Sequence, residues 1–101
     1  MRIPLICFIA AVAVSEAAFG ALAGGDPVNG KTLAERWCAS CHLVSPEQPV
    51  TTTEAPPFES LAARSPEALQ AFLFNPHPPM PQLYLTRQEI RDLAAYIASL
   101  K

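Results

Sequence analysis

The stretch that decides the fold is Cys38-Ala39-Ser40-Cys41-His42. Cys-x-x-Cys-His is the spacing with which proteins attach haem covalently. The two thiols can add to the two vinyl groups on one edge of a porphyrin. The adjacent imidazole then lies beneath the ring, within reach of the iron. The motif therefore predicts one haem c attached through Cys38 and Cys41, with His42 bound to the iron.

Other uses of this cysteine pair fit the sequence less well. A zinc site needs four ligands, and the chain has only two histidines to complete one. A thioredoxin-like redox pair belongs in a β-α-β unit, and the sequence shows no strand pattern. A chance match is the remaining alternative. Covalent haem attachment takes place outside the cytoplasm, so the motif also predicts export.

The first 23 residues are typical of a secretory signal peptide. Arg2 supplies a positive charge, residues 3–14 are almost wholly apolar, and Ala21-Leu22-Ala23 has the small-x-small pattern of a cleavage site. We expect cleavage after Ala23 and a periplasmic location. An uncleaved membrane anchor is the alternative, but the apolar run is shorter than the ~20 residues of a spanning helix. Glu16 would also lie inside that span.

The remaining residues, 24–101, are expected to form one small domain. Domains this small often depend on a disulfide, a metal or a cofactor for stability. Cys38 and Cys41 are too close in sequence for a disulfide between them to stabilise the fold. We therefore expect the covalently attached haem to stabilise the domain. The net charge of −2 and the lack of a basic run predict no nucleic-acid partner.

Three helices are predicted from their start signals. Asp26-Pro27 is a capping residue followed by proline at the first helical position, and this helix leads to the cysteines. Ser65-Pro66 repeats the signal before an apolar stripe. Thr86 and Glu89 form a capping box before an apolar face at helical spacing. Residues 58–63 are expected to add one or two further turns.

The connections between these helices are rich in proline. Residues 43–57 contain four prolines and predict an irregular loop. Residues 75–81 also contain four, and because proline lacks an amide hydrogen, they predict a stiff extended strap. With no strand pattern anywhere, the fold class is predicted to be all-α, with three to four short helices.

The second axial ligand is predicted to be Met80, which lies in the proline strap. Once the leader is removed, Met80 is the only thioether left in the chain. A thioether together with an imidazole raises the reduction potential, as suits an electron carrier. His77, three residues earlier, is the rival ligand and would give a bis-histidine haem. We expect His77 to lie on the solvent side of the strap instead.

In the order of these features, the whole of residues 24–101 resembles the class I monohaem cytochrome c family, in its small bacterial periplasmic form. The resemblance implies that the first and last helices cross closely, with Gly30 against Tyr96 and Leu33 beside Leu93. It also implies a loop proline whose carbonyl accepts the second ring proton of His42. Pro56 is the expected residue, and Pro57 is the alternative.

The expected function is that of a periplasmic one-electron carrier with redox partner proteins and no small-molecule substrate. The alternative is a dedicated haem c subunit of a larger oxidoreductase, which would meet a membrane only through that complex. An enzyme or gas-binding protein, in which Met80 leaves the iron, is a third class and is not favoured. Only Lys31 and Lys101 are lysines, so the lysine ring with which many relatives dock acidic partners is missing. Trp37, beside the motif, is expected either to bond a haem propionate or to pack beside the ring.

Overall fold

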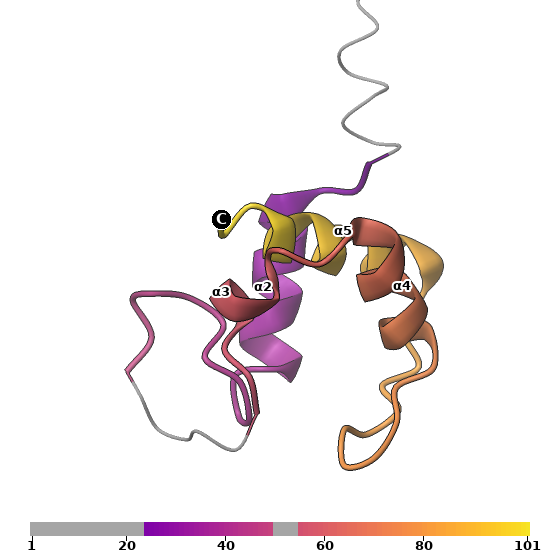
Figure 1. Cartoon of the computed structure of the whole chain (residues 1–101), viewed down its shortest axis with the longest axis horizontal. Coiled ribbons are helices and arrows are strands. Elements are labelled where there is room, and N and C mark those ends of the chain that lie inside the picture. Colours follow the sequence, from indigo (N-terminus) through magenta and orange to yellow (C-terminus); the bar gives the residue numbers. More distant parts are fainter. Residues whose placement is uncertain (1–23, 50–54) are drawn as a thin grey trace, which may run out of the picture.

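The structure is a computed structural model, which describes residues 24–49 and 55–101. The expected signal peptide, residues 1–23, lies outside the described part. The described residues form helices and connecting segments without a strand, which confirms the all-α prediction. The helices follow in the order α2 (Pro27–Trp37), α3 (Phe58–Leu61), α4 (Pro66–Phe74) and α5 (Arg87–Ala98) (Figure 1).

Helix α2 begins where the sequence predicts. The side chain of Asp26 accepts hydrogen bonds from the amides of Val28 (2.9 Å) and Asn29 (3.4 Å). Pro27 occupies the first helical position, where a missing amide hydrogen costs nothing. The helix ends at Trp37, so the cysteine motif directly follows its last turn.

The other predicted start signals are also present. Ser65 caps α4 by accepting from the Ala68 amide at 3.1 Å. Thr86 accepts from the Glu89 amide at 3.1 Å, and the Glu89 carboxylate accepts from the Thr86 amide at 2.9 Å. This reciprocal capping box fixes the first turn of α5. The strap between α4 and α5 contains no helix, as its prolines require.

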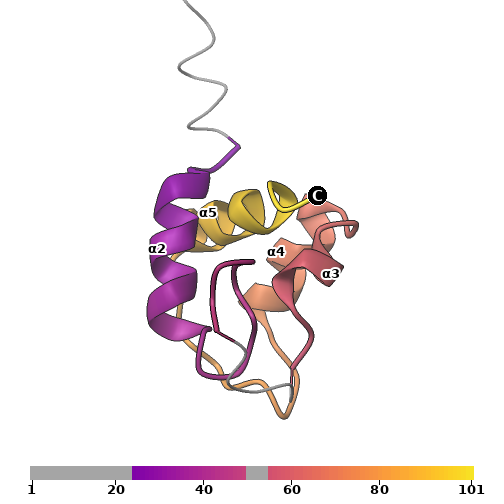
Figure 2. The ribbon, with the colours of Figure 1, turned by 90° about the vertical axis from the view of Figure 1, so that its left-hand side faces the viewer.

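The core lies where α2 crosses α5, and both views show this crossing (Figures 1 and 2). Gly30 of α2 faces the backbone of Asp92 and the side chain of Tyr96. A Cβ atom at Gly30 would overlap the Asp92 carbonyl oxygen and lie 2.8 Å from the Tyr96 Cβ. Only glycine permits this approach. The expected pairing of Gly30 with Tyr96 is therefore confirmed. The buried cluster around it comprises Leu33, Ala34, Cys38, Val44, Phe58, Leu69, Leu93, Ala94, Tyr96 and Ile97.

A buried carboxylate joins the two crossing helices. Asp92 of α5 is only 3 % exposed. Its oxygens accept from the Asp26 amide, the Asn29 side-chain amide and the Gln88 side-chain amide, each at 2.7 Å. Burial alone raises the pKa of Asp92. The three hydrogen bonds and the neighbouring Arg91 charge outweigh this effect, so the net pKa lies below its ordinary value.

Candidate cofactor site

The cysteine motif forms a tight turn that continues α2. The Cys41 amide donates to the Cys38 carbonyl at 3.1 Å, and the His42 amide donates to the same oxygen at 2.9 Å. Both cysteines are free thiols, with Cys38 buried and Cys41 exposed. The turn thus brings two thiols and one imidazole together at the end of a single helix.

The Cys38 thiol does not have the lowered pKa of a reactive cysteine. Burial, followed by the proximity of Cys41, raises the pKa of Cys38 from 9.0 to about 11. Reactive cysteines in Cys-x-x-Cys motifs have a lowered pKa instead, because their surroundings stabilise the thiolate. The environment of Cys38 therefore argues against disulfide exchange.

His42 is held by a single hydrogen bond from its ring. Its Nδ1 lies 2.6 Å from the carbonyl oxygen of Pro56. A carbonyl only accepts, so Nδ1 carries the proton and Nε2 is left with a lone pair for a metal. Of the two prolines considered, the structure brings Pro56 to the imidazole. The Pro57 carbonyl accepts instead from the amide (3.0 Å) and the hydroxyl (2.6 Å) of Ser60.

Two aromatic rings support the imidazole from the core side. Phe58 is 4 % exposed, and its ring centroid lies 5.1 Å from that of His42. Tyr96 lies behind Phe58, with centroids 6.5 Å apart. The Tyr96 hydroxyl donates to the Val44 carbonyl at 2.6 Å, and the Phe58 amide donates to the Leu43 carbonyl at 2.9 Å. Helix α5 thereby fixes the segment that follows His42.

Gln48, which was not predicted from the sequence, holds the same segment in place from the loop side. Its side-chain amide donates to the carbonyls of Ala39 and His42, both at 3.2 Å, and its oxygen accepts from the Val44 amide at 3.0 Å. Nothing in the sequence marks Gln48, because the loop has no periodic pattern and its partners are backbone atoms. The turn bearing His42 is therefore held on both sides.

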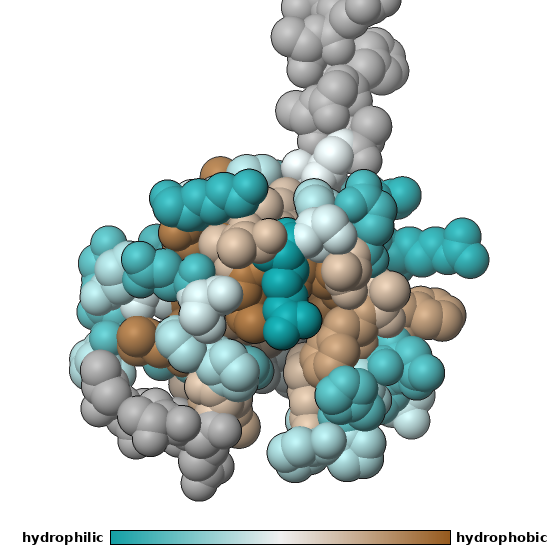
Figure 3. All heavy atoms as spheres, in the orientation of Figure 1, coloured by the Kyte–Doolittle hydropathy of each residue, from teal (hydrophilic) through white to brown (hydrophobic). Residues whose placement is uncertain are grey.

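Met80 lies in the second loop, between α4 and α5, and is partly buried. Both loops extend from the same side of the helices (Figures 1 and 2), and the surface is hollowed between them (Figure 3). His77 is exposed, and its ring meets the edge of Phe72 with centroids 4.8 Å apart. Trp37 is 53 % exposed and lies beside the Arg36 guanidinium.

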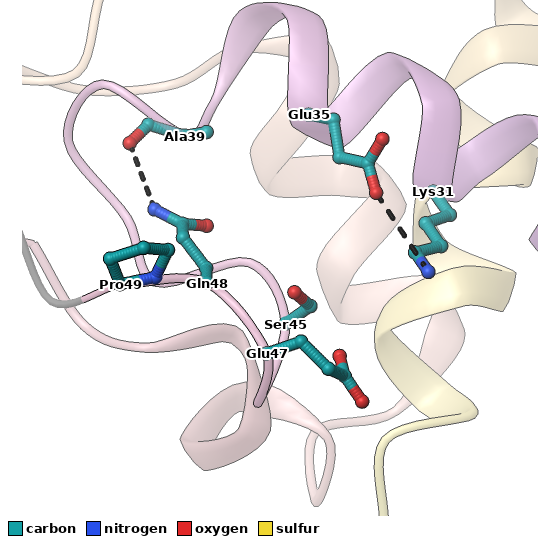
Figure 4. Close-up of a pocket in the computed structure, with 7 residues that line it drawn as sticks. All are labelled: Lys31, Glu35, Ala39, Ser45, Glu47, Gln48 and Pro49. Carbon is teal, nitrogen blue, oxygen red and sulfur yellow. Dashed lines mark hydrogen bonds and ion pairs between the residues drawn. The ribbon is translucent and has the colours of Figure 1, made fainter.

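A separate pocket of about 390 Å³ lies on the outer face of α2 (Figure 4). An ion pair between Lys31 and Glu35, 3.8 Å apart, crosses one side of it. None of the thiols, the imidazole or the thioether lines this pocket. Its lining residues are Lys31, Glu35, Ala39, Ser45, Glu47, Gln48 and Pro49. This pocket is therefore not the cofactor site.

Within residues 24–49 and 55–101, no group of three or more His, Cys, Asp or Glu side chains is arranged to hold a metal ion. No helix in the same ranges is long and apolar enough to cross a membrane.

A helical fold with a Cys-x-x-Cys-His turn at the end of its first helix is the architecture of a c-type haem protein. Comparison with known proteins agrees. Residues 27–101 match the cytochrome c family, and the chain belongs to that family. Cytochrome c-552 of Bradyrhizobium diazoefficiens is 48 % identical over 99 residues, which cover 95 % of this chain and 92 % of the relative. No solved structure matches.

Membership of this family makes the chain an electron-transfer haem protein that carries covalently attached haem c and acts with redox partner proteins. The residues present fit that cofactor. Cys38 and Cys41 are free thiols at the attachment spacing, and His42 has one ring nitrogen free for a metal. Met80, in the loop between α4 and α5, carries a partly buried thioether. The sequence prediction of the family and of its cofactor is thus confirmed.

Proposed function

We propose that this protein is a periplasmic carrier of single electrons, exported by residues 1–23 and cut after Ala23. The haem is attached through Cys38 and Cys41, and its iron is bound by His42 and Met80. When bound, the haem supplies a one-electron ferric/ferrous couple. The polypeptide holds the axial ligands in position and excludes water from the haem.

The observation that carries this proposal is the 2.6 Å contact between His42 Nδ1 and the Pro56 carbonyl. Metal-binding histidines almost always donate their second ring proton to a carbonyl or carboxylate, which fixes both tautomer and ring orientation. Here that bond is made while Nε2 stays free. The Phe58 ring and the Gln48 side chain prevent the imidazole and its backbone from turning away.

The assignment of Met80 rests on the strap that carries it. Prolines before and after Met80 restrict the backbone, so the side chain is presented with little loss of conformational entropy. His77, in the same strap, is exposed and already paired with Phe72. In the strap, the thioether of Met80 is therefore partly buried, whereas the imidazole of His77 is exposed to solvent.

Visible spectra of the periplasmically expressed holoprotein test this assignment. The wild type and His77→Ala should show the weak red band of Met-ligated ferric haem, whereas Met80→Ala should lose it. His77→Ala is the matched control, because it removes the rival ligand from the same strap. A wild type without the red band, whose spectrum changes in His77→Ala and not in Met80→Ala, would sink the Met80 assignment.

The same preparation tests the export and carrier parts of the proposal. N-terminal sequencing should begin at Gly24, and the protein should be recovered alone from the periplasmic fraction. Recovery in fixed stoichiometry with other subunits would instead identify a dedicated subunit of an oxidoreductase. Addition of cyanide should leave the ferric spectrum unchanged at first, since a ligated iron has no open position. Rapid binding would favour the gas-binding class.

A further inference from the structure

A short turn after the cysteine motif brings the chain back to Gln48. The Gln48 amide donates to the Ser45 carbonyl at 3.2 Å, which closes a four-residue turn. Pro46 occupies the second position of this turn, where its fixed φ is favourable. Pro49 follows directly and disfavours helical backbone at Gln48. Two prolines therefore limit the backbone conformations from which the Gln48 side chain projects.

The Gln48 side chain bonds two carbonyls of the haem-attachment turn, residues 38–42. Its amide nitrogen donates to the carbonyl of Ala39, which lies between the two cysteines, at 3.2 Å (Figure 4). The same nitrogen donates to the carbonyl of His42, also at 3.2 Å. Because one nitrogen bonds both carbonyls, Ala39 and His42 cannot move apart without breaking one of these bonds. Gln48 therefore constrains the position of His42 relative to the cysteines.

The same side chain is anchored to α5 through Val44. The side-chain oxygen of Gln48 accepts from the Val44 amide at 3.0 Å. Val44 is only 1 % exposed, and its carbonyl accepts from the Tyr96 hydroxyl at 2.6 Å. Tyr96 is itself buried where α2 crosses α5. A continuous path of hydrogen bonds therefore runs from α5 through Val44 and Gln48 to His42.

The orientation of the His42 imidazole depends on this support. Its Nδ1 lies 2.6 Å from the carbonyl of Pro56, which is 14 residues further along the chain. A bond between two loop segments lasts only while both segments keep their places. The Phe58 amide, bonded to the Leu43 carbonyl at 2.9 Å, ties the Pro56 segment to the motif. Gln48 holds the backbone of His42 itself, so a loss of its bonds would let the contact between Nδ1 and Pro56 lengthen.

We propose that Gln48 is a positioning residue for the iron ligand: its two donated hydrogen bonds keep His42 in place, so that Nδ1 stays bonded to Pro56. The proposal rests on the ligation of iron by His42 proposed above. An imidazole whose second ring proton is hydrogen-bonded is a more basic metal ligand. A more basic ligand favours ferric iron, which has the greater positive charge. Gln48 thereby lowers the reduction potential of the carrier, acting through the backbone of His42.

Hydrogen exchange of the His42 Nδ1 proton, followed by NMR in the ferrous holoprotein, tests this proposal directly. Gln48→Met keeps the length of the side chain and removes its hydrogen bonds. The proton should be protected in the wild type and should exchange about ten- to a hundredfold faster in Gln48→Met, the effect expected of losing two hydrogen bonds. Gln48→Glu keeps an acceptor for Val44 but has no donor, so its exchange should be faster as well.

Gln82→Met is the matched control, because it makes the same substitution in the other loop. The Gln82 side chain also bonds backbone groups, the Phe74 carbonyl at 3.2 Å and the Tyr84 amide at 3.4 Å. These groups belong to α4 and the strap. Gln82→Met should therefore leave the exchange of the His42 Nδ1 proton unchanged.

Two further measurements separate positioning from a general effect on stability. The amides of Leu93 and Ala94, which are buried in α5, report the opening of the whole fold. Their exchange should rise less in Gln48→Met than that of the Nδ1 proton. The midpoint potential of Gln48→Met should be higher than that of the wild type, since a weaker bond to Pro56 makes the imidazole less basic.

The outcomes separate this proposal from the ligation on which it rests. If His42 does not bind the iron, its ring protons lack the shift that the ring current of a haem imposes, and the ligation itself is refuted. Shifted ring protons with equal Nδ1 exchange in wild type and Gln48→Met would refute only the role of Gln48. An unprotected proton in the wild type, protection retained in Gln48→Glu, an equal rise at the α5 amides or a midpoint potential that does not rise would also overturn that role.

Discussion

Replacement of Asp92 by asparagine removes the buried charge that joins α2 to α5 and keeps the shape of the side chain. Asp92 accepts three hydrogen bonds of 2.7 Å from Asp26, Asn29 and Gln88, and it is 3 % exposed. An asparagine at this position has one acceptor oxygen in place of two. Rotation of the Asn29 side chain can restore a neutral bond to the new amide, so the main loss is that of the charge.

The expected loss follows from the strength of charged hydrogen bonds. A bond to a charged group contributes about 1.5–3 kcal/mol to stability, against about 0.5–1.5 kcal/mol for a neutral one. Three bonds weakened in this way, with Asn29 and Gln88 able to reach water, give a decrease in the free energy of unfolding of about 1.5–3 kcal/mol. Small domains are stable by only about 5–15 kcal/mol, so the change is large enough to measure.

The pH dependence of this loss has a definite sign. The pKa of Asp92 in the folded protein is lowered from its ordinary value of 3.8. A lowered pKa means that the folded state favours the carboxylate, so its contribution is fully present well above pH 3.8. It is lost as the pH falls through the folded-state pKa. A protonated Asp92 is as neutral as asparagine, and the difference between wild type and Asp92→Asn should therefore shrink towards zero in acid.

Guanidinium unfolding of the two holoproteins between about pH 7 and pH 3, followed by circular dichroism, measures this difference. Glu47→Gln, which neutralises an exposed loop carboxylate, is the control and should change stability little at any pH. Equal stability of Asp92→Asn and the wild type at pH 7 would contradict this prediction. A difference in stability at pH 3 as large as that at pH 7 would contradict it as well.

Two further substitutions test the helix crossing and the support of His42. Gly30→Ala should lower the free energy of unfolding by about 1–3 kcal/mol or more, since its Cβ would overlap the Asp92 carbonyl. Thr32→Ala on the exposed side of α2 is the control in the same unfolding experiment, and equal stability of the two variants would contradict the close approach. Tyr96→Phe should cost about 1–3 kcal/mol, because the buried Val44 carbonyl loses its donor. Burial, then the charges of Glu35 and Glu47, raise the pKa of Tyr96 above 10.0, so the wild type loses this advantage over Tyr96→Phe only as the pH rises beyond 10. Tyr84→Phe, at an exposed ring, should show neither effect.

Local signals in the sequence predicted where the helices begin and which residues attach the haem and bind its iron from the motif side. The caps at Asp26, Ser65 and Thr86 act on amides two or three residues away, so their effect can be read without knowing the rest of the fold. The same holds for Cys38, Cys41 and His42, whose spacing alone places two thiols and an imidazole on one turn. In each case the physical interaction spans no more than five residues.

Contacts between distant residues were harder to infer. Pro56 was preferred to Pro57 through the family resemblance, and the fold shows that the Pro56 carbonyl reaches His42. Gly30 opposite Tyr96 was expected from the family resemblance and not from any local pattern. Asp92 was missed altogether. In the sequence, Asp92 stands two residues after Ile90 and directly before Leu93. This position is typical of a polar residue on the solvent side of an amphipathic helix.

The sequence by itself determined the chemistry of this protein. The Cys38–His42 motif, the thioether of Met80 and the absence of charge over residues 68–86 all follow from the order of residues along the chain. The tertiary structure decided which groups surround that chemistry. It buried Asp92 between α2 and α5, placed Phe58 and Gln48 around His42, and brought Phe74 and Tyr84 to one groove. The reason is physical. Bonds within one turn depend on the local backbone, whereas burial and partners across the fold depend on how all the helices pack together.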